Sequence, residues 1–506
     1  MTDSPTVARP TPGTPRPYEF PPFERHWLSN GMTLITVDLP GRPLVSATLV
    51  MRQGAADEPP SLGGATVLAA RALSEGTERY DAVALVEAAE RLGASLHAEA
   101  SWDAVTAGLD VPAARLEPAL ELLEEMVARP TFPEAEVERL RDERLNDLLQ
   151  ARADPRRRAE EAFADTIYTP DSPYHRPSGG QRDTVAGLAS PALREVLDRG
   201  LDPARLTLVV GGDLNGLDVH GMADRLFGSW ETSSRARVPG EPRSASAVSD
   251  RFVRVVHRPG AVQTEIRVGH VGLSRRIPDF HALSVMSAIL GGLFNSRLNM
   301  KLREEKGYTY GAGAGFDLRR AAGPFAARAA VNTEVTVPAV VDMVAELRRI
   351  RDEKVSNAEL RAARDYLVGV FPLRFETPGP VVGALAGLVV HDLPDDELIR
   401  YRPAIEAVGI EDVARAARHV DVDRAAIVLV GDADAFASEL EKAGLGPVVV
   451  ERDEAPAVRG PLEGVDEQLG PVDDGTAPGP TEGADEPTEG TEDPAGQPTG
   501  DDSRAV

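Results

Sequence analysis

The first half of the chain alternates short stretches of two-residue periodicity with amphipathic helical stretches. Apolar and polar residues alternate in SNGMTLITVDLP around the Asn30-Gly31 pair, which predicts strands joined by a tight turn. The stretches LVSATLVMRQGA and ASLHAEASWDAVTAGLDV predict further strands, and RLTLVVGGDL closes this half as another. Helical periodicity marks residues 82–92, residues 116–127 and the charged stretch that ends before Pro155.

The same pattern then repeats in the second half. LEPALELLEEMV matches VPAVVDMVAELR at an offset of 220 residues, PEAEVERLRDERL matches SNAELRAARDYL at 223, and RLTLVVGGDL matches RAAIVLVGDA at 219. Three matches at nearly one offset indicate a tandem duplication of a single unit. Because each unit mixes strands and helices, we predict an α+β fold with two similar domains.

Composition sets the expected domain boundaries. A chain of 506 residues is too long for one hydrophobic core. The last fifty or so residues are rich in Pro, Gly, Thr, Asp and Glu and contain no aromatic residue, which is typical of a solvated acidic tail. We expect a disordered Pro-rich lead at 1–22, a first domain at 23–231, a Ser-, Arg-, Pro- and Gly-rich linker at 232–250, a second domain at 251–450 and the tail at 451–506.

Charge and residue usage narrow the function classes. A formal charge of −26 argues against nucleic acid as a partner, because phosphate contacts need basic surface. The chain has no cysteine, so thiolate chemistry and Cys-ligated zinc are excluded. It has no apolar run of the ~20 residues that span a bilayer and no signal-peptide core at its start, so we expect a cytoplasmic protein that does not enter a membrane.

The segment from Leu290 to Gly315 is the first candidate for chemistry. It is bordered by glycines and holds a charged helical stretch followed by the run GYTYG. Glycine at this density lets a backbone approach another group closely or adopt positive φ. Arg303 and Tyr310 lie seven residues apart, on either side of a predicted helix-to-strand turn, and both can donate hydrogen bonds.

The duplicated α+β architecture, over about residues 23–445, resembles the insulinase-like M16 metallopeptidases of the M16B group, which are LuxS/MPP-like. The resemblance implies a mostly antiparallel sheet covered by helices in each half. In that family a helix of the first half carries H-x-x-E-H within G-x-A-H-F-L-E-H-M-x-F-K-G-T, and the two His bind zinc while the Glu polarises water. The matching stretch here is GATVLAARALSEGT, which starts at Gly64 and ends at Thr77.

By this resemblance the zinc motif is degenerate. Val67 stands at the first His position, Ala70 at the Glu and Arg71 at the second His, while Asp147 lies near the position of the distal Glu ligand. None of the nine His of the chain shows ligand-like spacing to another. We therefore expect this chain to bind no zinc, with Arg71 placing a positive charge where the metal would lie.

The second half keeps the other part of the family's site. LGGLFNSRLNMKLREEKGYTYGAGAGF is similar to the family segment in which an Arg and a Tyr face the zinc, and this implies that Arg303 and Tyr310 bind the substrate main chain and support the oxyanion. Tyr308 would face the other way. On residue type alone, an ion-paired Arg303 and a half-buried Tyr310 remain open as alternatives.

Three functions follow from these observations. The first is a non-catalytic, substrate-binding subunit of a heterodimeric M16 peptidase, whose paralogous partner carries H-x-x-E-H and the zinc and which cleaves peptides. Peptide would then be held as an added strand along a sheet edge. The second is a structural scaffold with no role in proteolysis, like the core subunits of the respiratory bc1 complex. The third is a peptidase active by itself through an unfamiliar site, which the missing ligands oppose.

Overall fold

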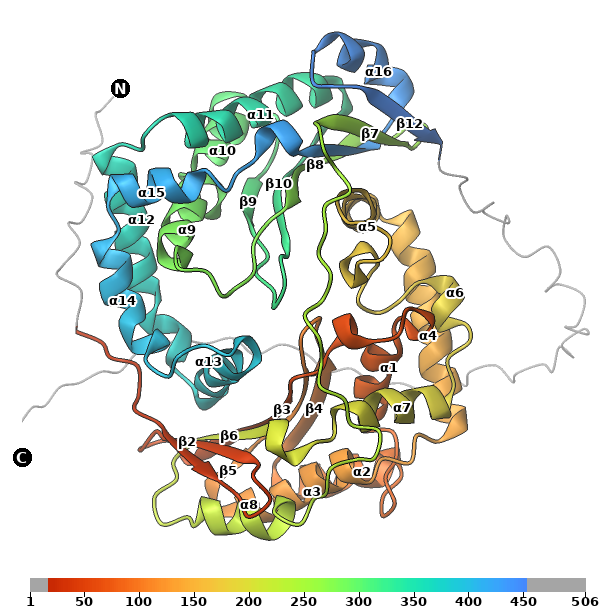
Figure 1. Cartoon of the computed structure of the whole chain (residues 1–506), viewed down its shortest axis with the longest axis vertical. Helices are drawn as coiled ribbons and strands as arrows, with labels where there is room; N and C mark the ends of the chain where they lie inside the picture. Colours follow the sequence, from red (N-terminus) through yellow and green to blue (C-terminus); the bar gives the residue numbers. More distant parts are fainter. Residues whose placement is uncertain (1–16, 453–506) are drawn as a thin grey trace, which may run out of the picture. The chain divides into compact units, whose positions relative to one another are not determined.

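The computed structural model describes residues 17–452, which form two six-stranded sheets with helices packed on them (Figure 1). The first half contains the strands β1 (Glu24–Trp27), β2 (Thr33–Asp38), β3 (Leu44–Met51), β4 (Ser95–Ala100), β5 (Val105–Pro112) and β6 (Leu206–Gly212). Its helices are α1 (Ala65–Ala72), α2 (Ala82–Leu92), α3 (Leu116–Ala128), α4 (Glu134–Ala153), α5 (Pro155–Ile167), α6 (Arg182–Val185), α7 (Ser190–Gly200) and α8 (Val219–Phe227).

The second half has the same composition of elements. Its strands are β7 (Phe252–His257), β8 (Gln263–Val271), β9 (Ala312–Phe316), β10 (Pro324–Asn332), β11 (Ala426–Gly431) and β12 (Val448–Arg452). Its helices are α9 (Phe280–Ser287), α10 (Arg297–Asn299), α11 (Thr336–Asp352), α12 (Asn357–Val370), α13 (Pro378–His391), α14 (Glu397–Ala407), α15 (Ile410–Ala417) and α16 (Ala433–Lys442).

The strand order confirms the duplication. The first sheet has the order β1-β2-β6-β3-β5-β4 and the second β12-β7-β11-β8-β10-β9, so five strands correspond and only the first edge strand differs in origin. The pairs β2–β6, β7–β11 and β7–β12 are parallel, and the other pairs of these named strands are antiparallel. Both units are therefore α+β and mostly antiparallel, as the sequence predicts.

Helix α2 shows how local sequence sets an element. The Asp81 side chain accepts a hydrogen bond from the amide of Ala84 at 2.8 Å, which caps the start of the helix. Gly93 takes a φ of 68° directly after the last turn, a conformation that glycine adopts without a Cβ penalty. The helix predicted over residues 82–92 is confirmed.

Each half lends one helix to the sheet of the other half. Helix α5 packs on β8 and β11 of the second sheet, whereas α13 packs on β3 and β6 of the first (Figure 1). Phe163 of α5 is buried in one cluster with Val428, and Leu385 of α13 is buried in another with Val37. The two halves consequently share hydrophobic cores, an arrangement that the sequence pattern does not reveal.

Packed residues and part of a strand lie slightly outside the domain boundaries expected from the sequence. Phe20 lies within the expected lead, yet it is buried and its ring meets Phe375 edge-on with 5.0 Å between centroids. Strand β12 continues to Arg452, inside the expected tail. Most of that lead (1–16) and that tail (453–506) lie outside the described residues.

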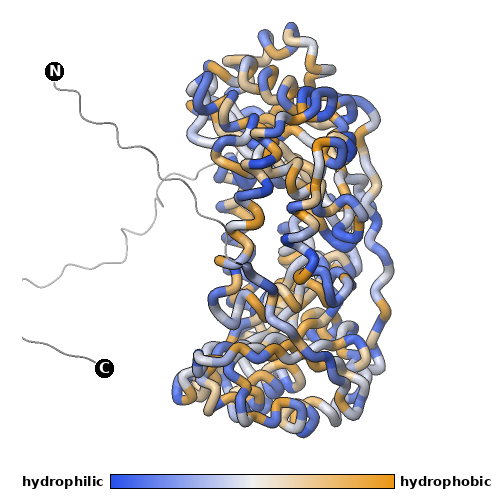
Figure 2. The backbone as a smooth tube through the Cα atoms, turned by 90° about the vertical axis from the view of Figure 1, so that its left-hand side faces the viewer, coloured by the Kyte–Doolittle hydropathy of each residue, from blue (hydrophilic) through white to orange (hydrophobic). Residues whose placement is uncertain are grey.

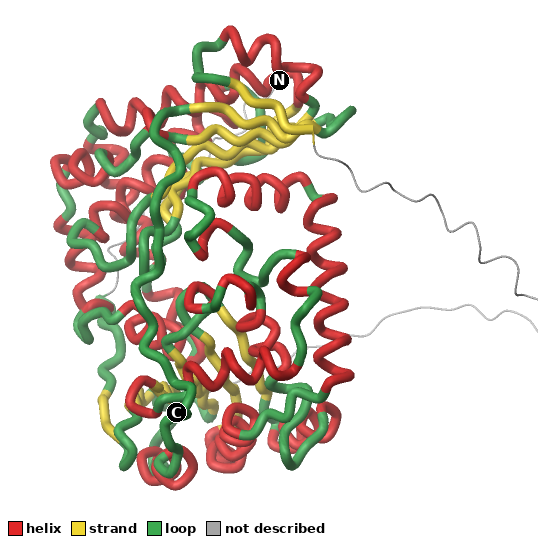
Figure 3. Tube along the Cα trace, turned by 45° about the vertical axis from the view of Figure 1, so that its right-hand side comes forward, coloured by secondary structure: helices red, strands yellow, loops and turns green. Residues whose placement is uncertain are grey.

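The two halves are joined by a long connecting segment. Residues 232–250, expected as a linker, form a long loop with one isolated bridge from Tyr168 to Ser246 (Figure 3). Within residues 17–452, no helix has the length and the apolar content needed to cross a bilayer. Apolar and polar positions are interspersed along the described chain instead (Figure 2).

Candidate functional site

Helix α1 carries the stretch that matches the family's zinc motif, and local packing explains the glycine that precedes the helix. The amide of Gly64 donates to the buried carboxylate of Glu58 at 2.9 Å. Gly64 has a φ of 96°, and a Cβ there would lie 2.7 Å from the carbonyl oxygen of Gly179. The positive φ and the close approach to Gly179 require glycine for the fold alone, so the presence of Gly64 says nothing about metal binding.

The end of the matching stretch also has a structural role. Helix α1 ends at Ala72, four residues before Gly76. Gly76 and Thr77 instead form isolated β-bridges, to Asp81 and Pro130 respectively. The Gly-Thr pair therefore joins α1 to the start of α2 and the end of α3.

The positions of the missing zinc ligands offer a metal nothing to bind. Val67 and Ala70 have no donor atom, and Ala70 is buried. The Arg71 guanidinium donates to Glu143 of α4 at 2.9 Å, and Arg139 donates to the same carboxylate at 2.6 Å. These residues do not fit a zinc ion, because a cation with its own counter-ion occupies the place of the second His.

Asp147 does not meet Arg71 in an ion pair. It accepts a hydrogen bond from Arg157 at 2.7 Å and another from Arg144. The hydrogen bond from Arg157 is the main cause that lowers the pKa of Asp147, so the carboxylate is ionised and engaged. The carboxylate opposite Arg71 is Glu143, one turn earlier on α4.

The segment from Leu290 to Gly315 follows an unusual helical path. Residues Ala288–Gly292 and Met300–Glu305 are π-helical, with α10 between them. π-Helical turns are rare and are frequent at functional sites. The side chain of Asn299 holds the turn to β9, because its oxygen accepts from the amide of Ala312 at 2.8 Å. Periodicity of apolar residues does not distinguish this path from an ordinary helix.

Gly291 in this segment brings the chain close to itself, whereas a Cβ on Gly311 or Gly315 would meet no other atom of the described chain within 4 Å. A Cβ on Gly291 would lie 2.1 Å from the backbone nitrogen of Ala314 in β9. Gly307 has a φ of 65° and ends the helical stretch. The small residues of AGAGF therefore allow the first π-helical turn to pack against β9.

The structure places Arg303 and Tyr310 on either side of the helix-to-strand turn, as the sequence predicts. The guanidinium of Arg303 stacks over the ring of Phe294, 4.6 Å from its centroid, and lies 3.5 Å from Glu304. Tyr310 is 93% exposed, whereas Tyr308 packs against the core of the second half. Within the described part of the chain, the Tyr310 hydroxyl makes no hydrogen bond, so the half-buried alternative for this residue does not hold.

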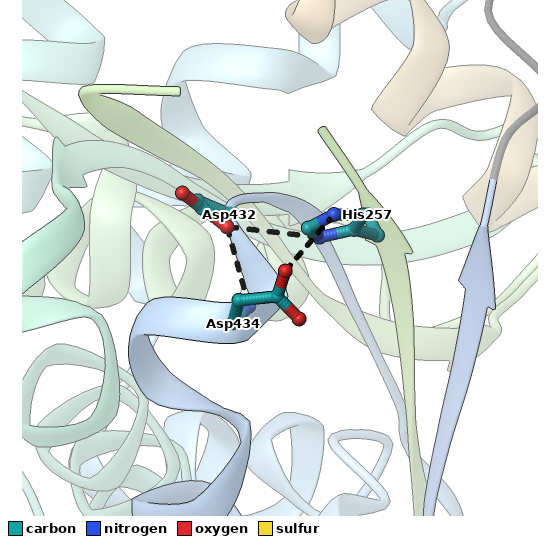
Figure 4. A group of neighbouring side chains, drawn as sticks. All are labelled: His257, Asp432 and Asp434. Carbon is teal, nitrogen blue, oxygen red and sulfur yellow. Dashed lines mark hydrogen bonds and ion pairs between the residues drawn. The ribbon is translucent and has the colours of Figure 1, made fainter. Parts of the chain in front are cut away.

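A cluster that spacing along the chain does not reveal lies at the end of β7. Figure 4 shows His257 facing Asp432 and Asp434 at the start of α16, with ring nitrogens 3.7 and 3.6 Å from their carboxylate oxygens. Nδ1 of His257 accepts a hydrogen bond from the amide of Ala433 at 3.1 Å. Nε2 therefore carries the proton and has no lone pair for a metal.

The corresponding position in the first half supports a structural role for this cluster. Asp38, at the end of β2, accepts a hydrogen bond from the amide of Leu214 at 3.1 Å. His257 occupies the same place at the end of β7. In both halves this side chain ties down the backbone that follows the neighbouring central strand, so the cluster is a backbone tie rather than a metal site.

Comparison with known proteins identifies the family. The description "Insulinase (Peptidase family M16)" matches residues 33–173, and "Peptidase M16 inactive domain" matches residues 190–367. The chain belongs to the M16 peptidase family. The helix with the degenerate motif lies in the first match, and the segment with Arg303 and Tyr310 lies in the second.

Relatives of this M16 chain carry differing descriptions. An uncharacterized zinc protease of Mycobacterium tuberculosis is 24% identical over 78% of this chain and 90% of its own length. One of Streptomyces coelicolor is 25% identical over 56% of this chain, which spans 62% of that relative. A non-peptidase homolog, YmxG, of Helicobacter pylori is 23% identical over 62% of this chain and 72% of its own length.

Solved structures agree with the M16 fold. A peptidase M16 inactive domain from Pseudomonas fluorescens superposes with a TM-score of 0.75 at 24% identity, covering 81% of this chain and 98% of that one. A protease from Helicobacter pylori gives a TM-score of 0.74 at 19% identity, covering 82% of this chain and all of that one. At these identities the likeness establishes the fold alone.

Proposed function

We propose that this chain is the non-catalytic, substrate-binding subunit of an M16 zinc metallopeptidase heterodimer that cleaves peptides. In this role Arg303 and Tyr310 reach the zinc site of a paralogous H-x-x-E-H subunit, hold the substrate main chain and stabilise the oxyanion. This chain itself supplies no zinc ligand.

The observation that carries the proposal is the presentation of Tyr310. A tyrosine that is 93% exposed buries almost no apolar area and makes no internal hydrogen bond among the described residues, so the fold gains nothing from it. Arg303, supported on Phe294, is the second donor of the same turn. A pure scaffold has no use for two such donors beside a π-helical turn.

The peptide has a free sheet edge available in the first half. β4 is the last strand of its sheet, next to β5 on one side only. β9 is the equivalent edge of the second sheet. An extended peptide added to β4 would form backbone hydrogen bonds that tolerate many sequences.

The test is reconstitution of the complex with a paralogue that carries H-x-x-E-H. We expect Arg303→Ala to lower kcat of peptide cleavage by about 100-fold and Tyr310→Phe by about 10- to 100-fold, since both remove a donor to the oxyanion. Lys301→Ala and Tyr308→Phe are the matched controls, because Lys301 pairs with Glu305 on its own helix and Tyr308 packs inward. If Arg303→Ala and Tyr310→Phe both left the rate of peptide cleavage unchanged, the proposal would be wrong and the scaffold role would be favoured.

Zinc content provides a separate test of the same proposal. Elemental analysis of this chain purified alone should find far less than one zinc per chain, because the positions of the family's ligands hold Val67, Ala70 and Arg71. One tightly held zinc per chain would contradict the non-catalytic assignment even if the reconstituted complex were active.

A further inference from the structure

A cavity at the boundary between the two halves is lined by arginines from both of them. Its volume is about 350 Å³. Four arginines line it: Arg25 in β1, Arg52 after β3, Arg205 before β6 and Arg320 in the loop from β9 to β10. Asp392 is the one acid among the described residues that line the cavity, so its wall carries more positive than negative charge.

Two of the four arginines are neutralised by a close carboxylate. Arg25 donates to Asp395 at 2.6 Å, and Arg320 donates to Asp57 at 2.6 Å. The Nε of Arg320 is buried and makes no hydrogen bond among the described residues. The same Nε lies 4.0 Å from Asp103, so two carboxylates balance the charge of Arg320.

Arg52 is only weakly balanced. Its one carboxylate neighbour within 4.0 Å, counted over residues 17–452, is Asp392, at 3.9 Å. Asp392 is also 3.2 Å from Arg276, with which it forms a hydrogen bond. A carboxylate shared in this way, at such a distance, leaves much of the Arg52 charge exposed to the cavity.

Arg205 has no carboxylate partner within ion-pair distance in the described part of the chain. It donates to the carbonyl oxygen of Arg237, a neutral group. Burial is the main cause that lowers the pKa of Arg205. Attraction from Asp202 raises it and is larger than the repulsion from Arg52 or from Arg320, each of which lowers it. Three arginines therefore line this cavity with free hydrogen-bonding capacity between them, since within residues 17–452 Arg205 has no close carboxylate and Arg52 only a distant one.

We propose that this cavity binds a small anion that carries two or more phosphate or carboxylate groups. Arg52 and Arg205 are its main ligands from the first half, and Arg320 is its ligand from the second. Guanidinium forks bind both kinds of group through paired, charge-assisted hydrogen bonds. The cavity volume lies in the range of small-molecule sites.

A bound anion would bridge the two halves and stabilise the contact between them. It would accept hydrogen bonds from Arg52 and Arg205, which flank β3 and β6, and from Arg320 in the β9–β10 loop, and so join the two halves. Ligand binding to the folded state alone raises the unfolding temperature by mass action. This inference does not rest on the proposed peptidase role, because binding needs neither a partner nor zinc.

The test is thermal unfolding of the full chain, followed by circular dichroism, with pyrophosphate and with citrate as probes. Sodium chloride at matched ionic strength is the reference, because screening alone changes surface electrostatics. We expect a saturable rise in Tm of several degrees, about 3–6 °C, with at least one probe. A rise with pyrophosphate alone supports a phosphate ligand, one with citrate alone a carboxylate ligand, and one with both the shared chemistry.

Variants decide whether the effect belongs to this cavity. Arg52→Gln and Arg205→Gln should each reduce the rise in Tm, and the double variant should abolish it. Arg424→Gln should keep the full rise, since that arginine is exposed and pairs only with Asp421 on its own turn. Arg205→Lys, which keeps the charge but loses the fork, should weaken binding about tenfold. No rise with either probe, or an undiminished rise in the folded double variant, would overturn the proposal.

Discussion

At the scale of single residues, one ion pair anchors the segment that carries Arg303. The side chain of Arg297 is 6% exposed and its Nε donates to Glu359 of α12 at 2.7 Å. Glu359 also accepts a hydrogen bond from the amide of Ser356 at 2.8 Å. Burial raises the pKa of Glu359, but the hydrogen bonds from Arg297 and Ser356 outweigh it and lower the pKa to about 2.

This ion pair predicts a pH-dependent contribution to stability. Glu359→Gln should lower the free energy of unfolding by about 1–2 kcal/mol at pH 7, a value reduced for the partial exposure of the carboxylate. Because the folded pKa lies below the unfolded value of ~4.3, the ionised form stabilises the fold above that pH. The difference between wild type and variant should therefore shrink as the pH falls from ~4.3 towards 2, measured by urea denaturation.

Glu136 is the matched control, because it stands at the equivalent position of the first half. It bonds only Arg139 on its own helix, at 2.7 Å and on the surface, so Glu136→Gln should change stability by less than about 0.5 kcal/mol. Equal effects of the two substitutions, or a difference that grows on acidification, would contradict the role assigned to the Arg297–Glu359 pair.

The sequence predicts the positions of these single residues but not all of their contacts. The position of Arg303 and Tyr310 around a helix-to-strand turn follows from local pattern and is confirmed. The stacking of Arg303 on Phe294 does not follow, because it depends on π-helical turns whose signal is absent from the spacing of apolar residues. The pairing of Arg71 with Glu143 likewise depends on how α1 and α4 pack.

At the scale of elements, the sharing of α5 and α13 couples the two halves. Leu385 of α13 is 0% exposed and lies in a cluster with residues of the first sheet. If a helix that comes from the other half detaches, the apolar sheet face that it covers becomes exposed to solvent. The first half is therefore expected to depend on the second for part of its core.

Leu385→Ala tests this coupling. It should cost about 2–4 kcal/mol, the range for a large-to-small change in a core, and it should loosen the sheet of the other half. We expect faster amide hydrogen exchange in β3 and β6, measured by mass spectrometry. Ile399→Ala in the neighbouring α14 is the control, since Ile399 is 49% exposed. Faster exchange confined to α13 itself would show that the halves are not coupled through it.

Local pattern explains why these two helices are not among the predicted ones, whereas α2 is. Three features of the sequence predict helix α2: a capping residue, an apolar stripe and a terminal glycine. The sequence of α13, PGPVVGALAGLVVH, is apolar on nearly all sides, so periodicity gives neither its covered face nor its partner sheet. The start of α5, PRRRAEEAF, is strongly charged, and the apolar residues that it buries are few.

At the scale of the whole described chain, the tips of two equivalent hairpins meet. Arg320, between β9 and β10, donates to Asp57 at 2.6 Å, and its amide donates to Asp103, between β4 and β5, at 2.8 Å. The neighbouring Arg319 stacks over Trp102 at 5.0 Å from the ring centroid. Corresponding elements of the duplicated units thus hold each other, which a comparison of the repeats along the sequence does not indicate.

Arg320→Ala is expected to break these contacts and to lower the free energy of unfolding by an amount that depends on pH. Asp57 is 9% exposed in its side chain, and burial, only partly offset by Arg320, raises its pKa above the ordinary value. Without Arg320 the buried carboxylate has lost its cation, so the variant should lose about 2–4 kcal/mol at pH 7, where Asp57 must ionise. The loss should decrease as the pH falls through the raised pKa, because protonated Asp57 needs no cation.

Urea denaturation at pH 7 and pH 5 measures that loss, and small-angle scattering reports whether the halves separate. The double variant Asp57→Asn/Arg320→Ala should recover part of the stability, because both charges are then gone. Arg276→Ala is the control, since its ion pair with Asp392 is exposed on both sides and contributes less than about 0.5 kcal/mol. If Arg320→Ala behaved like that control, the polar contacts between the hairpin tips would contribute little. The halves would then be held by the shared hydrophobic cores under α5 and α13 and by ion pairs elsewhere, such as that of Arg267 with Glu160.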